Sequence, residues 1–267
     1  MFRHISKYVW FSFIPFVIGA MIVIALFATG YIPYIYLFAT LIGWTYISGL
    51  GTAIGYHRVF SHNTHPNLPR WKENILLFAG ALSGQGSSIT WVAIHRGYHH
   101  RYSDKIQDLH SPMIKGKWHA FIGWTMAITE ANNPINLKYS VDLLRKSNHV
   151  WFHEHGLKVL WIVPILVALI DWKLALAGLV LPTGLSLLQD NFVNVYGHQK
   201  AIIGYRTYDT DDNSHNNVLL GWFGWGQGWH NNHHYNMNSF NLGSGISGKW
   251  WEFDPCVIFL PFLGKGR

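Results

Sequence analysis

Histidines concentrate in four short stretches of the sequence, HRVFSH, HRGYHH, NVYGH and HNNHH. Neutral imidazole binds Zn, Cu, Fe and Ni, so this residue type predicts a metal site and leaves the metal open. Nine imidazoles are too many for one ion, whereas about four or five for each of two ions would suit the usual coordination numbers. The nine histidines are His57, His62, His95, His99, His100, His198, His230, His233 and His234.

The spacing within these stretches indicates which side chains can share an ion. Residues three or four apart lie on one face of an α-helix, so a metal ion beside that face can contact all of them. The groups that satisfy this rule are His230 with His233 and His234, His95 with His99, and Asn194 with His198.

The first stretch breaks this rule. His57 and His62 are five residues apart, which is about 140° around an α-helix. A straight α-helix would not direct both at one ion, so either a helix end between them or two different ions would be needed. In the last stretch, Asn231 and Asn232 are expected to point away from the histidine face, so changing them should be mild.

The rest of the sequence excludes several other metal chemistries. No HExxH motif is present, which disfavours a zinc protease, and carboxylates are scarce inside the stretches, unlike the Glu-bridged di-iron bundles. The single cysteine, Cys256, excludes an intrachain disulfide and a cysteine-ligated cluster. His110 is the best candidate among the other histidines for a role near the site. Candidate hydrogen-bond acceptors for ligand N–H groups are Asp104, Asp108, Asp209, Asp211 and Asp212.

These side chains must be positioned by a membrane protein. Charged residues make up 12% of the chain and hydrophobic residues 49%, about half the usual charged share of a soluble protein. Four apolar stretches could cross a bilayer, at residues 8–30, 31–55, 157–170 and 174–197. Residues 74–94 are apolar too, but Gly and Ser at 83–88 favour a helix that lies in the interface or packs on protein.

The basic residues predict the orientation. Of 20 Lys and Arg residues, only Lys173 falls in a proposed outer loop, so both termini and residues 56–157 and 198–267 are predicted to be cytoplasmic. All nine histidines then lie on that side. The net charge of +7 comes without a basic run, so nucleic acid is not an expected partner. The predicted fold is an all-α integral membrane domain over residues 1–267, with four transmembrane helices in two hairpins and a cytoplasmic helical cap that holds a di-metal site.

The motifs together resemble the membrane fatty acyl desaturases, the histidine-box di-iron enzymes, and especially the acyl-CoA Δ9 (stearoyl-CoA) type. The resemblance covers most of the chain from about residue 45. It rests on Trp91, four residues before His95, and on GYHRVFSH, HHRYSD, VDLL, NVYGH, YDTDDNSHNN, GQGWHNNHH and WWEFDP. It implies that the nine histidines bind two irons and that Asn194 reaches one iron through water.

The resemblance also implies a bent tunnel for the acyl chain, closed by side chains of the second span. Two departures concern the motifs themselves: the second is HxxxHH where the nearest acyl-CoA enzymes have HxxHH, and Gln227 replaces an acidic residue. Gln227 stays a candidate partner for a ligand N–H group. Substrate-binding candidates are Leu41, Trp44 and Thr45 in the tunnel, Trp91, and Lys115 and Lys117 at the phosphates of CoA.

The expected function is O2-dependent introduction of a cis double bond into a saturated acyl chain, with acyl-CoA as the favoured substrate and Δ9 as the favoured position. No donor domain is apparent, so the expected electron donor is external, such as cytochrome b5 or ferredoxin with its reductase. Two alternatives stay open: a related alkyl hydroxylase or olefin-forming decarboxylase, and a non-enzymatic metal carrier or sensor. A carrier would place its ligands near the bilayer midplane, which the predicted topology disfavours.

Overall fold

Helices form nearly all of the regular structure in this computed structural model, which describes residues 8–127, 137–200 and 203–266. Four helices are long and apolar enough to cross a membrane: Val9–Ala28, Tyr34–Ser61, Ser147–Ala168 and Trp172–Tyr196. The all-α membrane fold that the sequence predicts is therefore confirmed. The largest differences in bounds are in the second helix, which continues to Ser61 in the first histidine stretch, and in the third, which begins at Ser147.

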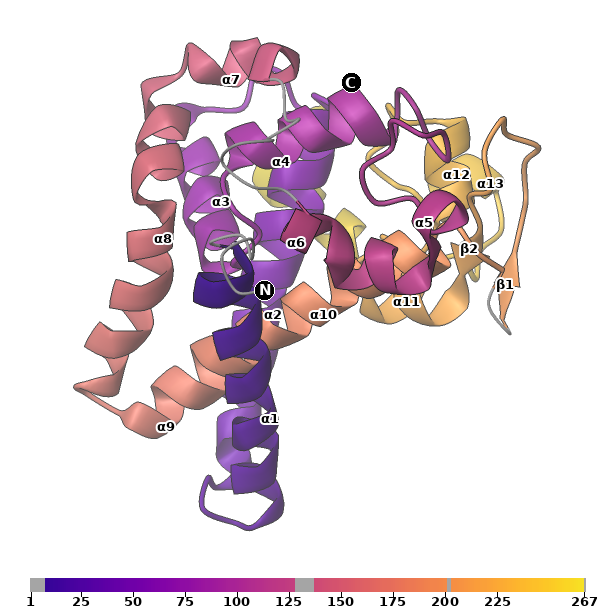
Figure 1. The fold of residues 1–267 in the computed structure, drawn as a ribbon. Coiled ribbons are helices and arrows are strands. Elements are labelled where there is room, and N and C mark those ends of the chain that lie inside the picture. Colours follow the sequence, from indigo (N-terminus) through magenta and orange to yellow (C-terminus); the bar gives the residue numbers. More distant parts are fainter. Residues whose placement is uncertain (1–7, 128–136, 201–202, 267) are drawn as a thin grey trace.

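The four spans are arranged as two hairpins that project to one side of the molecule (Figure 1). At the far ends of the hairpins, the Tyr36 hydroxyl donates a hydrogen bond of 2.6 Å to Asp171, which ties one hairpin to the other. The elements of the spans are η2 (Val9–Phe13), α1 (Ile14–Ala28), η3 (Tyr34–Tyr36), α2 (Leu37–Trp44), η4 (Thr45–Ser61), α8 (Ser147–Ala168), α9 (Trp172–Ala175), η8 (Leu176–Val180) and α10 (Leu181–Tyr196).

The apolar stretch at 74–94 is not a span. It forms two short helices, α3 (Arg70–Leu82) and α4 (Ser88–Ile94), and Ser87 caps the second by accepting a hydrogen bond from the Thr90 amide. α3 packs closely on η4, since a Cβ at Gly51 would lie 2.5 Å from the carbonyl carbon of Ala79. This contact holds the helix that carries His57 and His62 in a fixed position.

The other elements form a cap at the opposite end of the molecule from the hairpin turns (Figure 1). Its two short strands, β1 (Gly204–Tyr205) and β2 (Asn216–Asn217), pair antiparallel with Gly204 opposite Asn217. The helical elements are η5 (His95–His99), α5 (Pro112–Trp118), η6 (His119–Gly123), α6 (Trp124–Ala127), η7 (Leu137–Ser140), α7 (Val141–Leu144), α11 (Val218–Phe223), α12 (His230–Tyr235), α13 (Ser244–Ser247), η9 (Pro255–Phe259) and α14 (Leu260–Leu263).

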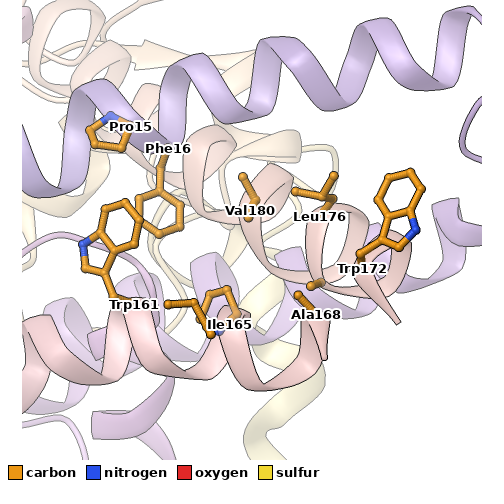
Figure 2. Close-up of a pocket in the computed structure, with 10 residues that line it drawn as sticks. Pro15, Phe16, Trp161, Ile165, Ala168, Trp172, Leu176 and Val180 are labelled. Atoms are coloured by element: carbon orange, nitrogen blue, oxygen red, sulfur yellow. The ribbon is translucent and has the colours of Figure 1, made fainter. Parts of the chain in front are cut away.

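A groove of about 310 Å³ lies between α1, α8 and the α9–α10 region. Figure 2 shows Phe16 and Trp161 at one end of the groove and Trp172 at the other. Its lining is apolar and includes no residue of the four histidine stretches. The groove therefore belongs to the membrane-spanning part of the chain and is separate from the histidines.

Candidate metal centre

The nine histidines form two clusters inside the cap. Within each cluster the candidate ligand atoms all lie within 4.8 Å of one another. The two clusters adjoin, since the His100 and His234 rings, one from each, have centroids 4.7 Å apart. The five-histidine cluster contains His57, His62, His95, His100 and His233, and the four-histidine cluster contains His99, His198, His230 and His234.

The second stretch is divided between the clusters in a way that the α-helix rule did not predict. η5 is π-helical, and the His100 amide donates to the His95 carbonyl, five residues back, at 3.0 Å. This wider turn puts His95 and His100 on one face. The expected pairing of His95 with His99 is therefore wrong, because His99 faces the other cluster.

The first stretch, HRVFSH, also places its two histidines on one face through a π turn. η4 is π-helical, and the His62 amide donates to the His57 carbonyl at 3.2 Å. Both side chains reach the five-histidine cluster, with ring centroids 4.9 Å apart. The expected helix end between them is present, because η4 ends at Ser61 and His62 is its C-terminal cap. Two different ions are not needed, since the five-residue spacing fits one π turn.

α12 lies between the clusters and contributes to both. His233 enters the five-histidine cluster, while His230 and His234 enter the four-histidine cluster, so the expectation that all three share one ion is wrong. Asn194 is half-buried on α10, one turn before His198, and its side chain makes no hydrogen bond to any residue that the structure describes. Its proposed contact with a metal through water remains a prediction.

The imidazole nitrogens face one another at short range. Two ligand nitrogens at right angles about an ion, each about 2.1 Å from it, would be about 3.0 Å apart. The observed Nε2–Nε2 distances are 2.9 Å for His57–His233, His62–His95 and His198–His230, 3.0 Å for His95–His100 and His100–His233, 3.2 Å for His99–His234 and 3.4 Å for His99–His198.

Hydrogen bonds at the other ring nitrogen test whether these contacts suit a cation. The amide oxygen Gln227 Oε1 lies 2.7 Å from His57 Nδ1 and can only accept, so His57 carries its hydrogen on Nδ1. Its Nε2 then presents a lone pair to His233. A lone pair directed into a buried cluster of imidazoles is what a metal cation binds, so His57 fits a metal centre.

Two carboxylates hold ring nitrogens in the four-histidine cluster. Asp104 Oδ2 lies 3.0 Å from His198 Nδ1, and Asp212 Oδ2 lies 2.6 Å from His234 Nδ1. Although burial alone raises the pKa of Asp104, its hydrogen bond with His198 and the charge of His198 lower it to about 2. An ionised acceptor of this kind fixes the ring orientation and makes the opposite nitrogen a better ligand.

The other three candidate aspartates do not hold a ring nitrogen as closely as Asp104 and Asp212 do. Asp108 is buried with Oδ2 3.5 Å from His99 Nδ1 and Oδ1 3.9 Å from His110 Nδ1. His99, Asp108 and His110 do not make a third metal site, because His99 directs its Nε2 into the four-histidine cluster. Asp209 and Asp211 are exposed, so the expectation that they would accept hydrogen bonds from buried ligands is wrong. Proximity in sequence did not separate them from Asp212.

Burial keeps most of these histidines neutral. It is the main reason why the pKa values of His95, His100, His230 and His233 are held well below the usual value for histidine, and neighbouring imidazoles add to the effect. A neutral imidazole has the lone pair that a metal ion needs.

Two arginines that the sequence reasoning missed hold the histidine helices in place. Arg58 is fully buried, pairs with Asp254 at 2.8 Å and also donates to Gln227 Oε1 at 3.4 Å. Arg96 donates to the carbonyls of Phe60 and Ser61, where η4 ends. Each arginine directly follows a histidine in its motif, and that repeated His-Arg pair was the available signal.

Asn231 and Asn232 point away from the clusters, as expected, but they are fully buried. Asn231 Oδ1 accepts from the amides of Thr207 and Tyr208, both at 2.8 Å. Asn232 Nδ2 donates to Glu252 at 2.6 Å. The expectation that changing them would be mild therefore loses its basis, because each change would leave buried polar groups unpaired.

The substrate-binding candidates are dispersed. Trp91 stacks on His95, with ring centroids 4.8 Å apart, and forms a wall of the five-histidine cluster. Trp44 and Thr45 are half-buried in the second span, and Trp44 packs against Trp225. Leu41 is 56% exposed, so its position does not support the expected place in an interior tunnel. The last two candidates, Lys115 and Lys117, are exposed on α5.

Comparison with known proteins places the chain among enzymes that act on acyl chains. A family model described as fatty acid desaturase matches residues 31–239, which include all four histidine stretches. The sn-1 stearoyl-lipid 9-desaturase of Synechocystis sp. is 32% identical over 224 residues, which cover 82% of this chain and 67% of that protein.

The names of two further relatives specify different carriers of the acyl chain, a lipid and an acyl-carrier protein. Delta-9 acyl-lipid desaturase 2 of Arabidopsis thaliana is 29% identical over 238 residues, covering 86% of this chain and 72% of that protein. The hex-5-enoyl-[acyl-carrier protein] acetylenase of Moorena producens is 30% identical over 254 residues, covering 82% of this chain and 72% of that protein.

Proposed function

The chain belongs to the fatty acid desaturase family, and from this premise we propose that it introduces a cis double bond at carbon 9 of a saturated acyl chain carried by a membrane lipid. The sequence motifs favoured acyl-CoA as the substrate. The names of two relatives, which specify stearoyl-lipid and acyl-lipid substrates, favour a lipid carrier instead. The position of the double bond follows from the same names.

We propose that the two histidine clusters hold two irons, with Asn194 reaching one of them through water. When bound, such a pair supplies an oxidant for an unactivated C–H bond and consumes O2 and two electrons. The observation that carries this proposal is the convergence of nine Nε2 or Nδ1 atoms into two groups, each within 4.8 Å.

The protein's own residues would orient the ligands and keep water out. Asp104, Asp212 and Gln227 hold ring nitrogens that face away from the clusters, which fixes the direction of each Nε2. Trp91 covers one side of the five-histidine cluster. The electrons would come from an external donor, such as cytochrome b5 or ferredoxin with its reductase.

The alternative of a metal carrier has less support. A carrier would place polar ligands near the bilayer midplane, whereas His57 lies near one end of its span and His198 follows the end of α10. A hydroxylase or an olefin-forming decarboxylase would use the same ligands, and no side chain in the described part of the chain favours either over a desaturase.

The test uses purified, iron-loaded protein in nanodiscs with ferredoxin, its reductase and O2. Deuterated stearate is supplied either in a membrane lipid or as stearoyl-CoA, and mass spectrometry locates any double bond. We expect a carbon-9 double bond in the lipid-linked chain that does not form under nitrogen. Product from stearoyl-CoA alone would overturn the carrier assignment, and a hydroxylated or decarboxylated product would overturn the reaction.

A further inference from the structure

Residues 112–123, which form α5 and η6, expose apolar side chains where the cap meets the spans. Met113 is 47% exposed, Ile114 is 40% exposed and Trp118 is 68% exposed. Lys115 and Lys117 lie between them, exposed and without an ion pair to any residue that the structure describes. A protruding segment that alternates large apolar and basic side chains is typical of contact with an anionic membrane surface.

The segment is joined directly to the cytoplasmic ends of two predicted spans. The Phe121 ring lies 5.2 Å from that of Phe192 on α10 and 6.3 Å from that of Phe13 on η2. Phe192 is itself exposed on its span. Both α5 and η6 contact α10, and Figure 1 shows α5 above α11, near α12 and β2 of the cap. The apolar surface of α5 therefore continues the lipid-facing surface of the spans.

The local structure holds both ends of α5 and leaves its middle projecting. Ser111 caps the helix by accepting from the Met113 amide at 3.1 Å, and His119 Nε2 donates to the Leu109 carbonyl at 2.9 Å. Gly116 between them has φ +81°, and a Cβ there would meet nothing within 4 Å. The bend at Gly116 is thus open to the surroundings and is not enclosed by protein.

We propose that residues 112–123 dock in the membrane leaflet on the cap side. Met113, Ile114 and Trp118 lie among the acyl chains and Lys115 and Lys117 contact anionic headgroup phosphates. Binding of CoA phosphates by the two lysines would leave the three apolar side chains unexplained. The proposal does not rest on the reaction, because it concerns only how the cap sits on the bilayer.

The first test measures the depth of the segment. The only cysteine of the chain, Cys256, is buried, so an introduced cysteine can be labelled selectively. The full-length Met113→Cys variant carries an environment-sensitive fluorophore in vesicles of phosphatidylcholine and phosphatidylglycerol. The control is Asp211→Cys, an exposed position in the loop between β1 and β2, which extends away from the spans (Figure 1).

We expect lipids brominated on the acyl chain to quench the label at 113 and aqueous iodide to quench the label at 211. Quenching at 113 by iodide and not by brominated lipid would overturn the docking. If the segment instead packed on a second copy of the chain, the label at 113 would escape both quenchers and emission would depend on protein density in the vesicle, which would also overturn it.

The second test identifies the charge partner of the lysines. Acetylation footprinting by mass spectrometry compares Lys115 and Lys117 with Lys105, which is exposed in the preceding loop. We expect vesicles with phosphatidylglycerol to protect Lys115 and Lys117 more than vesicles of phosphatidylcholine alone, with Lys105 unchanged. Protection by coenzyme A and not by anionic lipid would assign the lysines to a thioester substrate and overturn the headgroup contact.

Discussion

His57 is oriented by an amide oxygen, whereas His198 and His234 are oriented by carboxylates. Gln227 accepts hydrogen bonds from both His57 and Arg58, and Arg58 already has its counter-charge in Asp254. A neutral acceptor therefore satisfies both donors without a second negative charge. Gln227 was a candidate from sequence only because it replaces an acidic residue of the resembling family, and its contact with Arg58 could not be inferred from that.

We expect Gln227→Glu to keep its iron and its activity, because an acceptor stays beside His57 Nδ1. Gln227→Leu removes the acceptor and leaves the buried His57 Nδ1 hydrogen unpaired, so the affinity of the protein for iron should fall by about 10- to 100-fold. Competition with a chelator measures this affinity. Equal iron retention by Gln227→Leu and the wild type would contradict the assigned role of the amide oxygen.

At the scale of elements, the decisive feature is the π turn. The sequence predicted all nine histidines that the structure gathers, yet it did not predict their division between clusters. A π turn leaves no residue-type signature, and its effect is visible only in hydrogen bonds such as that from the His100 amide to the His95 carbonyl. One extra residue in the HxxxHH motif is absorbed by this wider turn, so His95 and His100 still face one cluster.

This geometry predicts the effect of changing the length of the motif. Deleting Tyr98 leaves His95 and His100 four residues apart. An ordinary α turn would then place both on one face of the helix. Iron content should therefore be largely kept, as measured by elemental analysis. Inserting an alanine after Gly97 offers no regular turn that restores the pairing and should lower iron content. If the deletion variant and the insertion variant lost iron equally, the π turn would not be what places His95 and His100 on one face.

The ion pairs of Arg58 and Arg96 differ in burial, and that difference determines how much each contributes to the free energy of unfolding. The Arg58–Asp254 pair is almost fully buried, with side chains 1% and 0% exposed, whereas Arg96–Asp142 is 25% and 54% exposed. Asp254→Ala should lower the free energy of unfolding by about 3–5 kcal/mol, since it leaves a buried charge unpaired. Asp142→Ala should cost less than about 1 kcal/mol.

Thermal unfolding of the two variants in the same detergent provides the comparison. Asp254→Ala should melt well below the wild type, and Asp142→Ala close to it. Equal melting temperatures for the two variants would mean that Arg58 does not hold the C-terminal part of the cap on η4.

At the scale of the whole molecule, composition and periodicity were enough to predict four spans and a helical cap. They were less able to set the bounds, because η4 and α8 each continue from the span into the cap as one helix. Orientation remains a prediction that rests on the basic residues, of which only Lys173 was assigned to an outer loop.

Labelling of intact cells tests this orientation. Ile170 is 89% exposed in the turn between α8 and α9, and Cys256 is buried. We expect a membrane-impermeant maleimide to label Ile170→Cys in intact cells and to label Asp211→Cys only after the membrane is opened. Labelling of Asp211→Cys in intact cells would place the cap and its histidines outside.

The central claim is that the histidines make two separate metal sites, and iron content of matched variants tests it most directly. His233→Ala removes a ligand from the five-histidine cluster, and His230→Ala removes one from the four-histidine cluster, while His215→Ala changes a histidine outside both. After reconstitution, elemental analysis should find about two irons per chain in the wild type and His215→Ala and about one in each of the other variants. Two irons retained in both His230→Ala and His233→Ala would contradict the claim.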